Sequence, residues 1–434
     1  MAGAVALALV TAVPLAALAL NEDGIFVGNE ALMLGGAVRS TVSDGSAAWY
    51  NPAGLATIER RTLMANINAF TYRSQLIERG IGVEGGSGAD IRVSNVNALP
   101  GSLAFGSSLS DRVSIGFGLF VTRADAISTG LTLAQQLDDV AYEFSATFDG
   151  RSQDYNAVLG IGFRPNDRSR YGATLVLRYA RQARTTVLWN ALQATGLDAV
   201  AGTSVQEQLT QSGIGLILGG QWDLSEIVTL SAVVATPILT VADTLRLLET
   251  NGSGFSVPGD GGTTLRVQQL RQLSSDGRFA GPTRMHLGLA VQPGPWTFAI
   301  DAEARIEPQI NGPGVAPTWN LRAGLQVDVS DRVSVGGGFF TDRTQAYELR
   351  NFGDELLQFV GGSLGLRVSN FIRLDPDERA PQIVRSTILG VRYAGAAGSY
   401  GALTINLDDN DVRTTRTRNR VHDVSLYLGA EFAF

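Results

Sequence analysis

Residues 296–305 read Trp-Thr-Phe-Ala-Ile-Asp-Ala-Glu-Ala-Arg, and this stretch decides the fold class. Every second residue is apolar, whereas the positions between them include Asp301, Glu303 and Arg305. Side chains on a β-strand point alternately to opposite faces, so the stretch predicts a strand with one apolar and one charged face. A soluble sandwich would bury the apolar face, whereas a membrane-spanning barrel would turn it to lipid and the charged face to the lumen.

The same alternation recurs from about residue 61 onward in segments of about ten residues, the length that a tilted strand needs to cross a bilayer. We predict fourteen strands, an even number as single-chain bacterial barrels require, near 61–73, 98–109, 112–122, 153–164, 170–182, 211–222, 227–239, 283–292, 296–306, 318–329, 332–342, 384–395, 399–408 and 422–434. Residues 356–368 also alternate, but they would make the number odd, so we expect them in a long loop.

Connections of two lengths alternate between these segments. Short turns such as residues 110–112 and 330–332 are rich in Asp and Ser, and long connections lie near 74–97, 123–152, 183–210, 240–282 and 343–382. Transmembrane barrels have short periplasmic turns and long extracellular loops, whereas a soluble sandwich has no reason to segregate its loops by length. The sequence therefore predicts an all-β fold, a transmembrane antiparallel barrel.

The C-terminal strand carries an independent signal. Residues 424–434 alternate to the last residue, Phe434, so the chain ends inside a strand. Outer-membrane barrels resemble one another in ending this way, and the strand is similar to the signal that the barrel insertion machinery reads. The alternative is a strand that merely closes a soluble sheet.

Residues 1–19 have the features of a secretory signal peptide. They form an apolar stretch that ends in Ala17-Leu18-Ala19, although no Arg precedes it. After residue 20 no apolar run approaches the roughly 18 residues that a spanning helix needs. We therefore expect an integral protein of the bacterial outer membrane, in contact with its lipid.

Composition excludes several chemistries. The 434 residues include no cysteine, two histidines and 34 basic residues that are all arginine. Cysteine nucleophiles, lysine Schiff bases and P-loops are therefore impossible, and a histidine-rich metal cluster is excluded. The net charge of −7 argues against a nucleic-acid partner. We expect neither a metal nor a cofactor.

Residues 20–60 lack the strand pattern and are rich in small residues, as a plug inside a barrel lumen would be. Within them, residues 44–56 read Asp-Gly-Ser-Ala-Ala-Trp-Tyr-Asn-Pro-Ala-Gly-Leu-Ala. This run resembles the hatch motif of the FadL/TodX family, outer-membrane transporters of long-chain fatty acids and aromatic hydrocarbons, with Asn51, Pro52 and Ala53 at its Asn-Pro-Ala core. The resemblance spans the mature chain.

The resemblance implies a barrel of residues 61–434 plugged by a hatch of residues 20–60. It also implies passive, hatch-gated transport of hydrophobic small molecules, with no enzymatic activity and lateral exit through a kink in the third strand. Gly116 and Gly118 are the candidates for that kink, because glycine in a strand often marks a bend, although glycine recurs in many of these strands. We expect long-chain fatty acids as substrates, with aromatic hydrocarbons as the alternative.

A fatty-acid carboxylate would need a cationic partner in the lumen. Strand parity gives lumen-facing candidates for this contact, Arg178, His286, Arg305, Arg322 and Arg392. The simpler interpretation is that these cations pair with Asp301, Glu303 and Asp328 and only fill the lumen, since buried charges are usually paired.

Three other functions compete with transport. A barrel lipase would need a serine beside a histidine, and neither His286 nor His422 has one two residues along its strand. An open porin would lack the plug. A structural or adhesive barrel remains an alternative on sequence grounds.

Overall fold

The computed structural model describes residues 25–84, 88–137, 140–194, 197–257, 260–273, 279–306, 317–344, 349, 352–373, 382–406 and 411–434. The predicted signal peptide, residues 1–19, lies outside the described residues. Among the described residues, no helix has the length and apolarity that crossing a bilayer requires.

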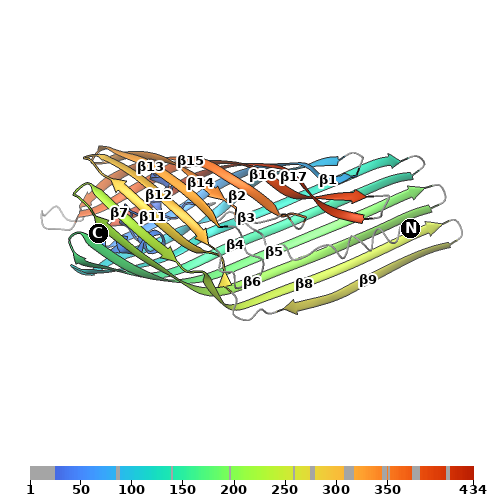
Figure 1. The fold of residues 1–434 in the computed structure, drawn as a ribbon, viewed down its shortest axis with the longest axis horizontal. Coiled ribbons are helices and arrows are strands. Elements are labelled where there is room, and N and C mark those ends of the chain that lie inside the picture. The colour runs from blue at the N-terminus through green and yellow to red at the C-terminus, as the bar shows by residue number, and fades with distance from the viewer. Residues whose placement is uncertain are drawn as a thin grey trace.

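The elements are three short helices followed by strand segments that form one closed sheet (Figure 1). The helices are α2 (Asn29–Met33), α3 (Ala47–Tyr50) and the 3-10 helix η1 (Pro52–Thr57). The strands are β1 (Thr62–Val83), β2 (Gly88–Ser110), β3 (Val113–Leu137), β4 (Val140–Asn166), β5 (Ser169–Ala194), β6 (Leu197–Asp223), β7 (Val228–Ala235), β8 (Ile238–Val257), β9 (Asp260–Leu273), β10 (Phe279–Ala280), β11 (Thr283–Val291), β12 (Trp296–Ile306), β13 (Thr318–Ser330), β14 (Val333–Arg343), β15 (Glu355–Arg373), β16 (Gln382–Asn406) and β17 (Asp411–Ala433).

The sheet is a barrel of fourteen antiparallel strands. β7 and β8 follow one another along the same edge of β6, so they are one interrupted strand. β9, β10 and β11 likewise follow one another along β8 and β7. Antiparallel pairing of β1 with both β2 and β17 closes the barrel. The predicted strand number is therefore confirmed.

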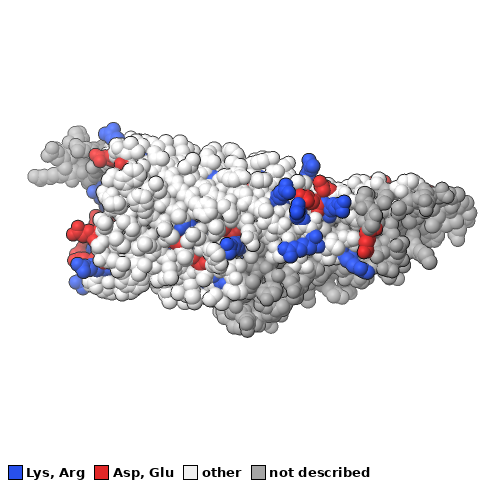
Figure 2. Space-filling model, turned by 45° about the horizontal axis from the view of Figure 1, so that its top comes forward, with Lys and Arg blue, Asp and Glu red and all other residues white. Residues whose placement is uncertain are grey.

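Burial decides between a sandwich and a membrane barrel. In β12 the apolar Ile300 is 52% exposed, whereas its charged neighbour Asp301 has no exposed surface. Figure 2 shows the exterior as a broad band with few charged side chains, bounded by charged residues toward both ends. An apolar exterior around a polar interior is the arrangement of a membrane-spanning barrel.

The predicted long connections are for the most part strand extensions. β3, β4, β5 and β6 contain 25 to 27 residues each, more than twice the roughly ten that cross a bilayer. Figure 1 shows these strands rising well beyond the shorter β11 to β14 on the other side. Outside the bilayer the outer face of a strand need not be apolar, so apolar and polar residues alternate less regularly in these extensions. The sequence pattern therefore did not predict them as strands.

Two predictions of individual strands are wrong, and the two errors cancel in the total number of strands. Residues 356–368, which we expected in a loop, lie in β15. The predicted strands 384–395 and 399–408 are the single strand β16. Residues 395–398 between them pair in register with residues 357–360 of β15.

Residues 25–60, here termed the N-terminal segment, pack inside the short-turn half of the barrel. Leu32, Met33 and Leu55 are at most 2% exposed and share one apolar core with wall residues such as Phe120 and Ile388. The chain then turns into β1, where Arg61 exchanges backbone hydrogen bonds with Phe434 at 2.9 and 3.1 Å.

Candidate functional site

Glycines on the inner wall make room for η1. A Cβ atom on Gly172 would lie 2.3 Å from the carbonyl carbon of Pro52, which no real contact allows, so only glycine lets η1 approach β5 this closely. Leu55, Asn51 and their neighbours make equally close approaches to Gly116, Gly160, Gly162 and Gly219. The high glycine content of these strands is therefore a packing requirement of the N-terminal segment.

Asn51 ties this segment to the wall. Its side chain is fully buried, and its Nδ2 donates to the carbonyl oxygen of Arg39 at 2.8 Å and to that of Gly220 at 3.4 Å. Its Oδ1 accepts from the backbone N–H of Ala53 at 3.1 Å and so caps η1, which begins at Pro52. The Asn-Pro-Ala residues thus hold the turn that seats η1 on β5 and β6.

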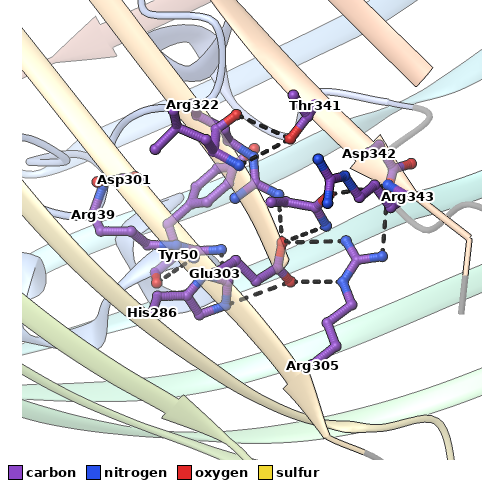
Figure 3. A network of polar contacts seen from close by, with 12 residues as sticks. Arg39, Tyr50, His286, Asp301, Glu303, Arg305, Arg322, Thr341, Asp342 and Arg343 are labelled. Carbon is purple, nitrogen blue, oxygen red and sulfur yellow. Dashed lines mark hydrogen bonds and ion pairs between the residues drawn. The ribbon is translucent and has the colours of Figure 1, made fainter. Parts of the chain in front are cut away.

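A charge network lies beside the segment (Figure 3). Glu303 accepts from Arg305 Nε at 2.9 Å and from Arg322 Nη2 at 2.7 Å. Arg305 also donates to Asp342 at 3.2 Å, and His286 Nε2 lies 3.9 Å from Glu303. These residues come from adjacent strands β11 to β14, and Arg305 has no exposed surface.

Arg39 of the N-terminal segment reaches into this network. Its backbone N–H donates to Asp301 at 3.0 Å, its Nη2 lies 3.4 Å from His286 Nε2, and its Nη1 bonds to the carbonyl of Tyr50. Two buried atoms, Arg39 Nε and His286 Nδ1, have no hydrogen-bond partner among the described residues.

The other predicted lumen cations lie apart from this network. Arg178 forms a two-bond ion pair with Asp154, at 2.7 and 2.6 Å. Arg392 is buried and stacks on the ring of Phe340. The pairing prediction is confirmed for Glu303. In the described chain Asp328, at the exposed end of β13, accepts from Gln326 and does not pair with these cations.

A cavity of about 100 Å³ lies between the N-terminal segment and the wall. Trp49 and Tyr50 line it from the segment, and apolar residues such as Ile217 and Val233 line it from the wall. Five arginines, Arg39, Arg123, Arg178, Arg284 and Arg322, line it together with His286 and with Asp154, the ion-pair partner of Arg178. Of the predicted ligand contacts, Arg178, His286 and Arg322 line the cavity, whereas Arg305 and Arg392 do not.

The third strand is irregular, but further along than the predicted glycines. Gly116 and Gly118 pair in unbroken register with β2 and β4, and the register shift lies between Val121 and Arg123. In the described chain, the ladder between β2 and β3 ends at the pair Leu103–Leu119 although both strands continue. A kink at the glycines stays a prediction.

Sequence reasoning missed Arg39, Trp49 and Tyr50. A usable signal exists for Arg39, which is the only basic residue between residues 20 and 59. A lone cation in a segment expected to fill the lumen needs a carboxylate from the wall. Within the described ranges no group of His, Asp and Glu side chains is placed to hold a metal ion.

Solved structures match the whole barrel. A FadL homologue from Pseudomonas aeruginosa matches with a TM-score of 0.65 and 12% identity, covering 96% of this chain and 100% of that chain. The chain has the FadL-type fold. The toluene transporter TodX of P. putida matches at 0.63 with 14% identity over 95% and 99% of the two chains, and the toluene transporter TbuX of Ralstonia pickettii at 0.56 with 11% over 95% and 99%.

No protein-family model and no curated protein matches the sequence. A closed barrel with the FadL-type fold and an apolar exterior is an integral membrane protein of the outer-membrane type, because closure is what satisfies every strand edge in lipid. In such barrels the short turns face the periplasm.

Proposed function

We propose that this chain is a FadL/TodX-type passive transporter of hydrophobic compounds in the bacterial outer membrane. The observation that carries the proposal is the cavity between the N-terminal segment and the wall, which apolar side chains and five arginines line together. Its position inside a barrel with the FadL-type fold supports a path across the membrane through this cavity. Diffusion through it needs neither nucleotide nor cofactor.

Long-chain fatty acids are the substrate class that the charges favour. Five arginines line the cavity, of which Arg178 pairs with Asp154 and Arg322 with Glu303. Guanidinium groups bind carboxylates through two parallel hydrogen bonds. In this proposal the fatty-acid carboxylate lies against the arginines that line the cavity.

Aromatic hydrocarbons are the second candidate, and cavity size favours them. A cavity of about 100 Å³ holds roughly a single aromatic ring, by comparison with apolar cavities that bind benzene. A fatty acid would need the cavity to lengthen when the N-terminal segment shifts.

In this proposal residues 20–60 are the hatch, residues 61–434 the barrel and residues 1–19 the signal peptide. Asn51, Pro52 and Ala53 anchor the hatch, and its movement opens the route from the cavity. A kink in the third strand at Gly116 and Gly118 provides a lateral exit into the outer-membrane lipid. The C-terminal strand is the recognition element for the insertion machinery.

The proposal is tested by uptake of a labelled long-chain fatty acid, and separately of labelled toluene, in cells that lack their own transporter. We expect uptake by the intact barrel and its loss in the double variant Asn51→Ala/Pro52→Ala at equal surface expression. Toluene uptake without fatty-acid uptake selects the second substrate class. No uptake of either compound by an inserted barrel contradicts the proposal.

A further inference from the structure

The outward face of β17 changes from apolar to basic partway along the strand. Toward the short-turn end its outward residues are apolar, namely Val424, Leu426 and Leu428. Toward the opposite end, beyond His422, three successive outward positions are exposed arginines, namely Arg420, Arg418 and Arg416. Arginine on the lipid-facing side of a strand is costly inside the bilayer, so the apolar band ends below these side chains.

Aromatic side chains mark the level at which the apolar band ends. Tyr72 of β1 and Tyr393 of β16 both pair with Val424, so their rings lie at one level on either side of β17. Exposed aromatic rings at the edge of an apolar band form the girdle of a membrane interface. Arg420 lies roughly 13 Å further along the tilted strand, at the level of the lipid headgroups. Because the short turns face the periplasm, these headgroups belong to the outer leaflet.

A fourth exposed arginine extends this row sideways. Arg92 of β2 and Arg420 of β17 both pair with Leu76 of β1, so they lie at one level, two strand spacings or roughly 10 Å apart. We name Arg92, Arg416, Arg418 and Arg420 the outer arginine patch. Figure 2 shows a group of basic side chains beyond the uncharged band.

A hollow of about 520 Å³ lies beside the outer arginine patch. It lies where β1 leaves β17 after the pair Ile77–Asn419 and joins β16 at the pair Ile81–Leu403. Arg79, between these two pairs, has a φ of 47°, and this left-handed conformation bends β1 away from β17. The bend leaves room at the outer surface of the wall for a ligand group.

Positive charge prevails around the hollow. Three arginines line it, Arg79, Arg416 and Arg418, together with two carboxylates, Glu78 and Asp90.

The two carboxylates leave most of this charge unbalanced. Glu78 forms an exposed ion pair with Arg420 at 3.3 Å, and such a pair contributes little to stability, so a ligand can replace it. In the described part of the chain, no carboxylate lies within ion-pair distance of Arg92 or Arg418. Arg416 donates from Nε to Ser399 Oγ at 2.7 Å, which fixes its guanidinium beside the hollow. The excess positive charge matches an anionic headgroup.

We propose that the outer arginine patch binds the phosphate groups of lipopolysaccharide, the phosphorylated glycolipid of the outer leaflet. A guanidinium group forms two parallel hydrogen bonds to a phosphate, which suits several arginines in a row to a headgroup with more than one phosphate. The acyl chains pack on Val424 and its outward apolar neighbours, and the sugar headgroup lies over the hollow. This site lies on the outer surface, apart from the lumen cavity, and does not depend on the proposed function.

The test measures binding of lipopolysaccharide to the folded barrel in detergent, by titration followed with native mass spectrometry. The triple variant Arg416→Ala/Arg418→Ala/Arg420→Ala should raise the apparent Kd at least tenfold, because it removes most of the phosphate contacts. Equal binding by this variant and the parent protein overturns the proposal. If the triple variant does not fold, as judged by heat-modifiable electrophoretic mobility, Arg418→Ala decides, with a severalfold weaker affinity expected and an unchanged affinity overturning the proposal.

A matched variant controls for the loss of charge. Arg112→Ala/Arg168→Ala/Arg332→Ala removes three exposed arginines from the short turns at the other end of the barrel. This variant should bind lipopolysaccharide as the parent protein does. If both triple variants weaken binding equally, attraction by net charge explains the result and the site is overturned.

Two further ligands identify what the patch recognises. Lipopolysaccharide from which the phosphates have been removed enzymatically should bind the parent protein about as weakly as intact lipopolysaccharide binds the patch variant. Equal binding of the intact and dephosphorylated forms overturns recognition of phosphate. Phosphatidylglycerol, which has phosphate but no sugar headgroup, should compete poorly. If it displaces lipopolysaccharide at equal phosphate concentration, the assignment to the glycolipid is overturned.

Discussion

Arg305 lies with no exposed surface between two carboxylates, Glu303 and Asp342. Desolvating three charges is costly, and the arrangement is stable because each group has a charged partner. Strand parity predicted that Arg305 and Glu303 face the lumen, but it could not predict Asp342 as a partner. The pairing depends on side-chain reach across neighbouring strands, which alternation does not encode.

Replacing Arg305 with alanine should destabilise the barrel by about 3–5 kcal/mol, because two buried carboxylates lose their cation. Urea unfolding followed by the loss of heat-modifiable electrophoretic mobility measures the change. Arg332→Ala, in an exposed turn, is the matched control and should have little effect. Equal stability of the two variants would contradict the buried network.

Gly172 tests the fit of η1 against the wall. Gly172→Ala should displace the N-terminal segment at a cost of about 1–3 kcal/mol, since the new Cβ atom would overlap the backbone of Pro52. Faster proteolysis of the segment reports the displacement. Gly130→Ala is the control, because its Cβ atom would meet nothing closer than 3.8 Å. Identical proteolysis rates would show that the close approach is not required.

At the scale of elements, α2 carries a buried carboxyl at the edge of the N-terminal segment. Burial, reinforced by nearby Asp44, raises the pKa of Glu30 from 4.5 to about 8, although Arg367 opposes the shift. One buried oxygen, Oε2, has no hydrogen-bond partner among the described residues, and Ser43 donates to the other at 3.0 Å. The docked segment therefore holds the Glu30 proton more tightly than the released segment does.

This difference predicts looser docking at high pH. The contribution of Glu30 to docking is fully present below pH 4.5 and is lost as the pH rises through about 8. Limited proteolysis of the segment should thus be faster at alkaline than at mildly acidic pH, and Glu30→Gln should reduce this dependence. An unchanged pH profile in Glu30→Gln would exclude this carboxyl as the cause.

Elements within the lipid band were predictable, and elements beyond it were not. Lipid selects one face of each strand, so β12 reads as strict alternation and its bounds, Trp296–Ile306, match the prediction. Outside the bilayer neither face has to be apolar, so the continuous strand β16 was predicted as two strands. The sequence also did not predict the strand breaks at Pro237 and Pro282. Pro237 falls near the end of the predicted strand 227–239, and Pro282 falls in the predicted connection 240–282.

At the scale of the whole molecule, one principle explains composition and function together. Many large apolar residues lie on the exterior of the wall, whereas charged residues such as Asp301, Glu303 and Arg305 are buried inside. The short helices of the N-terminal segment pack against glycines of the wall and fill the lumen at its short-turn end. A cavity remains between this segment and the wall. Closure and membrane location followed from the sequence, whereas the cavity required the packing of both parts.

The most direct measurement is a crystal structure of the barrel with a long-chain fatty acid brominated at its terminal carbon. Proposed transport predicts an anomalous bromine signal on the path through the cavity, with the carboxylate within hydrogen-bond distance of Arg39 or Arg322. A cavity that stays empty while the fatty acid binds elsewhere on the barrel would contradict the proposed route.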